Sequence, residues 1–286
     1  MNPLSMSEDD NPRSKNIDAL STLEIVQLMN DEDSLVAAAV HRELPQVARA
    51  IDAIASRMKA GGRLFYVGAG TSGRLGALDA SECPPTFGTP PEWVVGIIAG
   101  GPEALRRSIE GAEDKIQGAL PDLMRHGLDQ NDVVAGISAS GRTPFVLGAI
   151  EHARALRALT LGISCNQDSP VSKTVDIAIT PIVGPEVITG STRLKAGTAT
   201  KMVLNMLTTA TMIRLGRVAG NLMIDLDPAC SKLEDRAVRI VTRLSGLDPA
   251  AARDILQRCD GDARIAVLCA TRGLTPEQAR MLRAES

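Results

Sequence analysis

Short apolar runs alternate with helical patterns through the middle of the chain, and this alternation is the feature that most limits the fold. The runs are rich in β-branched residues and show no polar alternation, which suits strands buried on both faces of a parallel sheet. We therefore expect an α/β fold with a doubly wound, five-stranded parallel sheet flanked by helices. The predicted strands are residues 63–67, 93–98, 132–137, 160–164 and 177–181.

Helical patterns precede, separate and follow these strands. Ser21 and Glu24 form a capping box that begins the first predicted helix. The chain has 286 residues, enough for one large domain and a small addition. We predict helices at 21–30, 34–42, 45–60, 72–82, 102–126 (broken near 118), 144–156 and 192–215, then short helices from 228 onward. The predicted parts are a flexible N-terminus (1–20), the α/β domain with N-terminal helices (21–227) and a small helical domain (228–286).

Two loops of similar design follow the first and third predicted strands. Residues 68–74 read Gly-Ala-Gly-Thr-Ser-Gly-Arg, and residues 138–143 read Ser-Ala-Ser-Gly-Arg-Thr. Each loop places backbone N–H groups and hydroxyls at the start of a predicted helix, where the helix dipole favours an anion. Ligands of such sheets bind outside the carboxyl ends of the strands, so both loops are expected to face one crevice. The pair indicates a phosphorylated small molecule.

The first loop also satisfies a dinucleotide-binding pattern through Gly68, Gly70 and Gly73. That pattern needs an acidic residue after the second strand to hold the ribose, but the strand at 93–98 ends in Ala-Gly-Gly. The hydroxyls of the second loop suit a compact phosphate monoester better. From the residues alone we favour a sugar phosphate, and a dinucleotide or simple tight turns of small residues remain alternatives.

Composition argues against several other classes of function. The net charge is −3 and aromatic residues make up 2% of the chain, so neither a basic field nor a base-stacking surface is expected for nucleic acid. Five scattered cysteines without close pairing indicate reduced thiols and a cytoplasmic location. Neither zinc-type spacing, a signal-peptide pattern nor a membrane-spanning apolar run is present. We expect no metal, no cofactor and no membrane association.

Without a cofactor, side chains must carry the chemistry, and two carboxylates are candidates. Glu82 ends the helix predicted from the first loop, and Cys83-Pro84-Pro85 is expected to continue as extended backbone. Glu113 lies among three acids within residues 110–114. Two carboxylates in one site can divide the roles of acid and base, although each also fits a solvated position. Arg193 and Lys195 lie at the start of the helix at 192–215, where a bound anion would offset their charge.

At this point the chain resembles a known family. The stretches 68–74, 79–86, 110–114, 138–144 and 184–201 are similar to the N-acetylmuramic acid 6-phosphate etherases, whose core is a sugar isomerase (SIS) domain. The glucokinase regulatory protein shares the last stretch but is longer, with a duplicated SIS architecture. The resemblance implies cleavage of the D-lactyl ether of N-acetylmuramic acid 6-phosphate to N-acetylglucosamine 6-phosphate and D-lactate. It also implies a homodimer with active sites near the interface.

The resemblance assigns roles to particular residues. Glu82 is the expected catalytic acid/base for lactate departure and water addition, and Glu113 is the expected base at C2. Our own hypothesis is that Arg193 or Lys195 binds the lactyl carboxylate. An SIS aldose–ketose isomerase and a non-catalytic sugar-phosphate sensor are the alternative functions. The residues expected to hold the 6-phosphate are Gly70, Thr71, Ser72, Ser138, Ser140, Arg142 and Thr143.

Overall fold

The computed structural model describes residues 8–228 and 230–284, which form two compact units. The first unit comprises Met1–Ser81 and Glu92–Thr211, and the second comprises Glu82–Pro91 and Met212–Ser286. The boundary of the helical domain that we predicted between residues 227 and 228 remains a prediction. Among the described residues, no helix is both long and apolar enough to cross a membrane.

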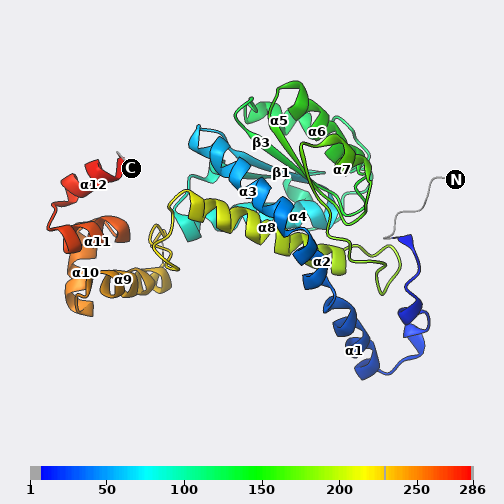
Figure 1. Cartoon of the computed structure of the whole chain (residues 1–286), viewed down its shortest axis with the longest axis horizontal. Coiled ribbons are helices and arrows are strands. Elements are labelled where there is room, and N and C mark those ends of the chain that lie inside the picture. Colours follow the sequence, from blue (N-terminus) through cyan, green and yellow to red (C-terminus); the bar gives the residue numbers. More distant parts are fainter. Residues whose placement is uncertain (1–7, 229, 285–286) are drawn as a thin grey trace. The chain divides into compact units, whose positions relative to one another are not determined.

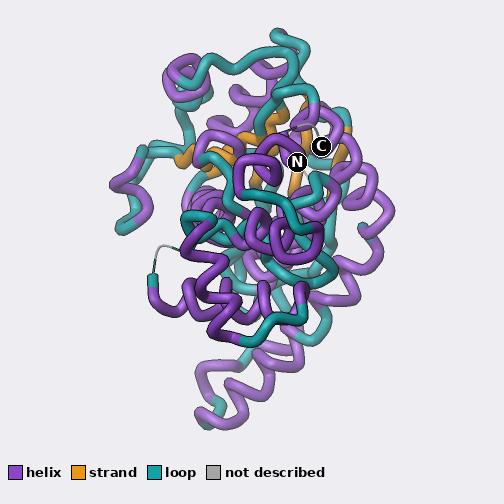
Figure 2. The backbone as a smooth tube through the Cα atoms, turned by 90° about the vertical axis from the view of Figure 1, so that its left-hand side faces the viewer, coloured by secondary structure: helices purple, strands orange, loops and turns teal. Residues whose placement is uncertain are grey.

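The first unit contains a five-stranded parallel sheet in the order β2-β1-β3-β4-β5, which confirms the predicted α/β fold. Figure 2 shows the strands lying together, with helices and loops making up the rest of the chain. Central strands are buried along their whole length, as the unbroken apolar runs predicted. The strands are β1 (Leu64–Gly68), β2 (Val94–Ile98), β3 (Val133–Ile137), β4 (Leu159–Ile163) and β5 (Ile177–Ile179).

Helices cover both faces of this sheet (Figure 1). Phe65, Val67 and Val134 point into an apolar core with α5, α6 and α7. On the opposite face α4 packs against β1, where the Tyr66 hydroxyl donates a hydrogen bond to Asp79 (3.1 Å), and α3 and α8 lie on this side. The helices of the first unit are α1 (Thr22–Asp33), α2 (Val36–Arg42), α3 (Leu44–Lys59), α4 (Gly70–Phe87), α5 (Leu120–Arg125), α6 (Pro144–Ala155), α7 (Pro170–Thr174) and α8 (Lys195–Arg214), of which α4 and α8 continue into the second unit.

The strand order reverses between β1 and β3, because β1 pairs with β2 on one side and with β3 on the other. In doubly wound sheets this reversal opens a crevice at the carboxyl ends of the two strands. The two phosphate-type loops follow β1 and β3 directly. The topology therefore brings the two loops to the same crevice.

The second unit is a cluster of short helices at the end of the chain. Asp248 and Asp262 accept hydrogen bonds from backbone N–H groups at the starts of α10 and α11, which explains where these helices begin. Gly246 and Gly273, in left-handed conformation, end α9 and α11. The helices are α9 (Ser231–Ser245), α10 (Pro249–Arg258), α11 (Ala263–Arg272) and α12 (Pro276–Ala284).

Two predicted helices were wrong in extent. Helix α4 does not end at Glu82 but continues through Pro84 and Pro85. Cys83 and Phe87 lie four residues apart on one buried side of the helix, and their burial outweighs the hydrogen bonds that the prolines cannot make. The predicted helix at 102–126 is instead a short 3-10 turn (Pro102–Leu105), an irregular segment over 106–119, and α5.

The predicted flexible N-terminus is anchored where the structure describes it. Residues 8–20 contain two 3-10 turns, Pro12–Ser14 and Ile17–Ala19. The side chain of Asn11 is buried and donates hydrogen bonds to Glu32 (2.9 Å) and to the carbonyl oxygen of Pro185 (3.3 Å). These contacts are distant in sequence, so local composition did not reveal them. Residues 1–7 lie outside the described part of the chain.

Candidate active site

A cavity of about 250 Å³ lies at the crevice between β1 and β3. Both loops contribute to its wall, as expected, and so does the N-terminal part of α8 through Gly197 and Thr200. Seven of the predicted site residues line it, and all belong to the first unit. They are Gly70, Thr71, Ser72, Glu113, Ser138, Ser140 and Thr143.

Hydroxyls of the second loop form a connected set at the cavity wall. The Ser138 hydroxyl lies 2.8 Å from the Thr143 hydroxyl and 3.4 Å from that of Ser140. It also accepts a hydrogen bond from the N–H of Gly141 (3.0 Å). Gly141 has a φ of +67°, which suits glycine, and a Cβ there would lie 2.2 Å from the Ser169 hydroxyl. The loop thus presents hydroxyls that can donate to phosphate oxygens.

The glycines of the first loop serve close packing of strand against helix. A Cβ on Gly68 would lie 2.7 Å from the backbone nitrogen of Gly73. A Cβ on Gly73 would lie 2.6 Å from the carbonyl oxygen of Gly68 and from Ile98. The dinucleotide-like spacing therefore follows from the tight approach of β1 and α4, and it brings Thr71 and Ser72 to the cavity.

Glu113 also borders a second cavity of about 130 Å³. The two cavities share Ala69, Gly70 and Glu113, so the carboxylate stands between them. The irregular segment 106–119, predicted as helix, supplies much of the second cavity's wall. That cavity also contains Arg74, whose guanidinium donates a hydrogen bond to the carbonyl oxygen of Arg107 (3.2 Å).

Three predicted site residues lie elsewhere in the first unit. Arg142 is exposed and does not line either cavity. Arg193 and Lys195 line a separate cavity of about 160 Å³ with Glu32 and Glu186. Their binding to a lactyl carboxylate stays a prediction. Glu82 is exposed on the part of α4 that belongs to the second unit.

Lys195 takes part in a buried ionic cluster at the start of α8. Its ammonium lies 2.5 Å from Glu32, a carboxylate of α1 that also accepts a hydrogen bond from Arg13 (2.8 Å). The carboxylate oxygens of Glu186 accept hydrogen bonds from the backbone N–H groups of Lys195 and Ala196, at 3.0 Å each. Such N–H groups at a helix start have no intrahelical partner. The cluster therefore fixes the first turn of α8, which leads into the cavity wall.

Burial and charge act in opposite directions within this cluster. Burial raises the pKa of Glu32, but the hydrogen bond and charge of Lys195, together with Asn11 and Arg13, outweigh it and hold that pKa below its usual range. Burial raises the pKa of Glu186, and the two backbone N–H groups only partly offset it. Burial and the charge of Glu186 raise the pKa of the Cys165 thiol to about 12.

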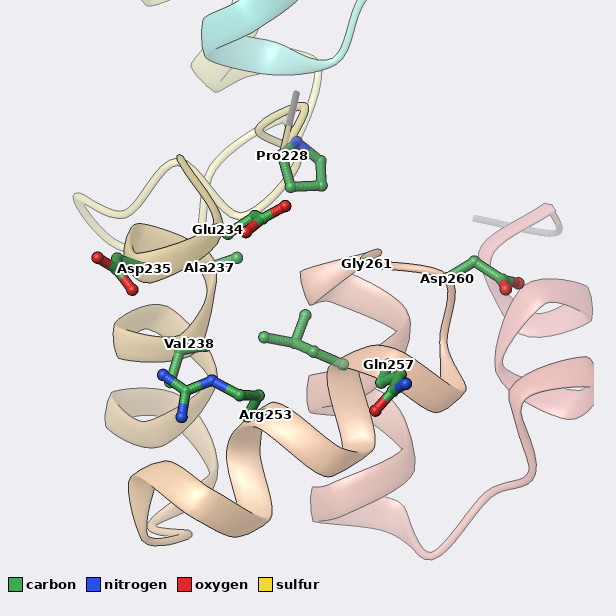
Figure 3. A pocket seen from close by; sticks show the side chains of 10 residues that line it. Pro228, Glu234, Asp235, Ala237, Val238, Arg253, Gln257, Asp260 and Gly261 are labelled. Carbon is green, nitrogen blue, oxygen red and sulfur yellow. The ribbon is translucent and has the colours of Figure 1, made fainter. Parts of the chain in front are cut away.

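The helical unit contains a cavity of its own, of about 600 Å³. Carboxylates of Glu234 and Asp235 on α9 and of Asp260 after α10 line it, with Arg253 as a cation (Figure 3). In Figure 3 the Arg253 side chain extends from α10 towards Val238 on α9. This acidic lining does not suit a phosphate. The cavity at the strand ends has carboxylates too, Glu8 and Glu113, but its loop hydroxyls can donate to phosphate oxygens, so it is the better anion site.

Several lining residues of the site were not predicted. Glu8 and Gly190 line the 250 Å³ cavity, and Arg74 and Glu110 line the adjoining one. Glu8 is far from the loops in sequence, so no local pattern could have found it. Arg74 was visible as the residue that follows the first loop's last glycine.

Comparisons with known proteins agree with this geometry. Residues 46–154 match the family described as glucokinase regulatory protein N-terminal SIS domain, and residues 118–210 match the SIS domain family. Among solved structures, a phosphoheptose isomerase from Francisella tularensis is 17% identical with a TM-score of 0.53, covering 68% of this chain and 100% of its own. A phosphoheptose isomerase from Neisseria gonorrhoeae is 13% identical with a TM-score of 0.51, covering 66% and 98%. At these identities the likeness shows the fold alone.

Curated relatives are much closer in sequence. The N-acetylmuramic acid 6-phosphate etherase of Rhodopirellula baltica is 52% identical over 96% of this chain and 91% of its own length. The enzymes of that name from Salmonella typhi and Edwardsiella ictaluri are 52% and 53% identical, covering 96% and 97% of this chain and 93% and 92% of their own lengths. With the SIS fold and the hydroxyl-lined cavity in place, this agreement identifies the chain as a member of the N-acetylmuramic acid 6-phosphate etherase family.

Proposed function

We propose that this protein cleaves the D-lactyl ether bond of N-acetylmuramic acid 6-phosphate and releases N-acetylglucosamine 6-phosphate and D-lactate. The observation that carries the proposal is its identity of about 52% to etherases over 96% of the chain. The cavity between β1 and β3 supports it, because its hydroxyls suit the 6-phosphate and Glu113 adjoins them. Residues Gly70, Thr71, Ser72, Ser138, Ser140 and Thr143 hold the phosphate in this proposal, with Arg142 beside them.

The reaction requires proton transfers and positioning. In the open-chain sugar the C1 aldehyde acidifies the C2 proton. A base removes this proton, the electron pair forms a C2=C3 double bond, and the C3–O bond breaks so that the lactyl oxygen leaves with a proton as lactate. Water then adds its hydroxyl to C3 while a proton returns to C2. Glu113 acts as the base at C2, and Glu82 protonates the leaving oxygen and activates the water.

The proposal is tested by incubating the protein with N-acetylmuramic acid 6-phosphate and assaying D-lactate. In water enriched in heavy oxygen, the label should enter the C3 hydroxyl of the sugar product and not the lactate. An aldose–ketose isomerase would release no lactate, and a sugar-phosphate sensor would bind the substrate without turnover. Either result from folded protein overturns the proposal.

Substitution separates the roles of the two carboxylates. Glu82→Gln and Glu113→Gln should each lower kcat by about 10²–10⁴-fold, since each removes a proton-transferring group. Exchange of the C2 proton with solvent should be lost in Glu113→Gln and kept in Glu82→Gln, because only the first step needs the C2 base. Full activity of either variant would remove that residue from the mechanism.

We also propose that the protein works in the cytoplasm as a homodimer. Five cysteines without a disulfide among the described residues suit a reducing compartment. Exposed apolar residues on α1, Leu23 and Val26, suit a surface that a second copy covers. Light scattering at micromolar concentration tests this, and a monomeric mass for the active enzyme would overturn the dimer.

A further inference from the structure

Glu8 brings a second carboxylate into the phosphate cavity. Among the described residues that line this cavity, all of them in the first unit, the titratable side chains are Glu8 and Glu113, and there is neither a lysine, an arginine nor a histidine. Glu113 has a role in the proposed reaction, as the base at C2. Glu8 has none, and its charge opposes that of a bound phosphate. A carboxylate at this position therefore needs a partner that the phosphate does not supply.

The N-terminal segment that carries Glu8 is fixed against the loop that leads into α8. The Asp10 carboxylate accepts a hydrogen bond from the Thr189 hydroxyl (3.2 Å). Asn11, which is 5% exposed, donates a hydrogen bond to the carbonyl oxygen of Pro185 (3.3 Å). Asp10 and Asn11 follow Glu8 by two and three positions. Their contacts therefore hold Glu8 at the cavity wall.

The Glu8 carboxylate packs against the backbone of Gly190, which also lines the cavity. A Cβ on Gly190 would lie 3.0 Å from Oε2 of Glu8 and 3.9 Å from Oε1. Within residues 8–228 and 230–284, no donor forms a hydrogen bond or an ion pair with this carboxylate, in contrast to Asp10 on the same segment. Its acceptor sites are therefore available to a ligand in the cavity.

An ionised carboxylate only accepts hydrogen bonds, so a ligand of Glu8 must donate them. The phosphate and the lactyl carboxylate of the proposed substrate offer charged acceptor oxygens, which Glu8 repels. The neutral part of the substrate has donors, which include the hydroxyl at C4 and, in the open-chain form, the hydroxyl at C5. With the phosphate on C6 held by the loop hydroxyls of the same cavity, these two are the sugar hydroxyls nearest to the phosphate.

We propose that Glu8 is a substrate-binding residue that accepts hydrogen bonds from the sugar hydroxyls at C4 or C5. The inference rests on the proposed function, since it takes the loops to hold the 6-phosphate. The charge of Glu8 then acts in two ways. It strengthens the hydrogen bond from a sugar hydroxyl, and it repels phosphates that have no hydroxyl to offer. Glu8 thereby selects a sugar phosphate over inorganic phosphate and simple phosphate esters.

Two phosphate monoesters of equal charge test the proposal. Borohydride-reduced N-acetylglucosamine 6-phosphate is an unreactive open-chain alditol with hydroxyls at C4 and C5, and ethyl phosphate has no hydroxyl on carbon. Glu8→Gln should weaken binding of the alditol phosphate about 10-fold, because a hydrogen bond to a charged acceptor is lost. The same variant should bind ethyl phosphate as well as the wild type or more tightly, because the repelling charge is gone. Calorimetry or NMR titration measures both affinities without turnover.

A merely structural role of Glu8 would weaken both ligands together. Equal weakening of the two, or an unchanged affinity for the alditol phosphate, would overturn the proposal. Asp9→Asn is the matched control, because it removes an exposed carboxylate from the same segment that does not line the cavity. It should change either affinity by no more than about twofold, since solvent and salt screen an exposed charge. A loss in Asp9→Asn as large as in Glu8→Gln would also overturn the assignment.

Steady-state kinetics separates binding from proton transfer. With N-acetylmuramic acid 6-phosphate, Glu8→Gln should raise KM about 10-fold and change kcat little, because a hydrogen bond to an unreacting hydroxyl contributes equally to the ground state and the transition state. A loss of kcat as large as that of Glu113→Gln, with KM unchanged, would make Glu8 a proton-transferring group and overturn the binding role. If the wild type releases no lactate, the etherase proposal fails, and the two affinities still decide the role of Glu8.

Discussion

Single residues at the start of α8 connect the N-terminal segment to the phosphate cavity. Lys195 is 2% exposed and Glu32 is 4% exposed, so the pair is shielded from solvent. Removal of one member of a buried pair leaves an uncompensated charge, which costs much more than the pair itself contributes. Gly197 and Thr200, two and five residues further along α8, line the cavity. The cluster thereby holds part of the cavity wall in place.

Lys195→Met should lower the free energy of unfolding by about 3–5 kcal/mol, because it removes the buried cation of Glu32 and leaves this carboxylate only the partly exposed Arg13. Adding Glu32→Leu to this variant should restore most of the loss. Chemical denaturation of the wild type, both single variants and the double variant measures the coupling. A Lys195→Met protein of unchanged stability that loses affinity for the substrate but not for N-acetylglucosamine 6-phosphate would instead make Lys195 the lactyl-carboxylate ligand.

The Glu32 carboxylate should also make stability depend on pH. Its pKa is held below the usual value of 4.5 in the folded state, so the charged form stabilises the fold fully above that pH. This contribution is lost as the pH falls through the folded-state pKa. The stability difference between wild type and Glu32→Gln should therefore be large at pH 7 and shrink below pH 4.5. Glu103→Gln, which breaks an exposed pair with Arg107, should show little difference at either pH.

The residues that contact the cavity were partly predictable. Hydroxyls and glycines at strand ends follow from local pattern, since the loop, the strand before it and the helix after it are contiguous in sequence. The ion pair of Lys195 is made with Glu32, a residue 163 positions away in the chain. A cation at a helix start was correctly noticed, but its partner was a buried carboxylate, which local sequence cannot reveal.

Among the elements, β1 and α4 approach each other closely. Gly73→Ala would force a methyl group to 2.6 Å from the Gly68 carbonyl oxygen and from Ile98. We expect a loss of about 1–3 kcal/mol in unfolding free energy, because neither backbone nor strand can move aside cheaply.

Gly197→Ala provides the control, since its methyl group would lie 3.6 Å from Thr71, an ordinary contact. It should leave stability unchanged or raise it by up to about 1 kcal/mol. Thermal unfolding of both variants checks the pair of expectations. Equal stability of the two would mean that β1 and α4 can separate without cost.

Strand positions were predicted to within a few residues because buried parallel strands have a strong apolar pattern. The ends of helices were less predictable. Pro84 and Pro85 indicated extended backbone, but burial of Cys83 and Phe87 kept α4 helical for another turn. At 106–119, acidic and small residues with helical spacing form an irregular wall of a cavity, because tertiary contacts decided their path.

At the scale of the whole molecule, the five thiols differ in their exposure to solvent. Cys83, Cys165, Cys259 and Cys269 are buried and Cys230 is exposed. Burial, with Cys269 nearby, raises the pKa of Cys259 to about 12, as burial does for Cys165. A thiol reacts as its thiolate, which is scarce at pH 8 for such groups.

A chromogenic disulfide reagent at pH 8 should therefore titrate one thiol per folded chain rapidly and five after denaturation. Cys230→Ser should remove the rapid phase. Rapid reaction of a second thiol in the folded protein would show that one of the buried sites opens on the timescale of the assay.

The proposed dimer is the level least open to prediction from the sequence. The resemblance implied a homodimer, but the surfaces that meet depend on which side chains the fold leaves exposed. The sequence does not indicate that Leu78 is exposed, since leucines at this spacing are equally common in a core. Its exposure became informative only with the helix built and its neighbours in place.

The number of residues in α4 has a consequence for how this chain can vary. If Thr71 holds the phosphate and Glu82 is the acid/base, as proposed, the 11-residue spacing between them is a functional length. One inserted residue would turn Glu82 by about 100° and shift it by about 1.5 Å. Exposed side chains of α4 can then change, while the number of residues between Thr71 and Glu82 cannot. Insertions and deletions between Thr71 and Glu82 should therefore be rejected.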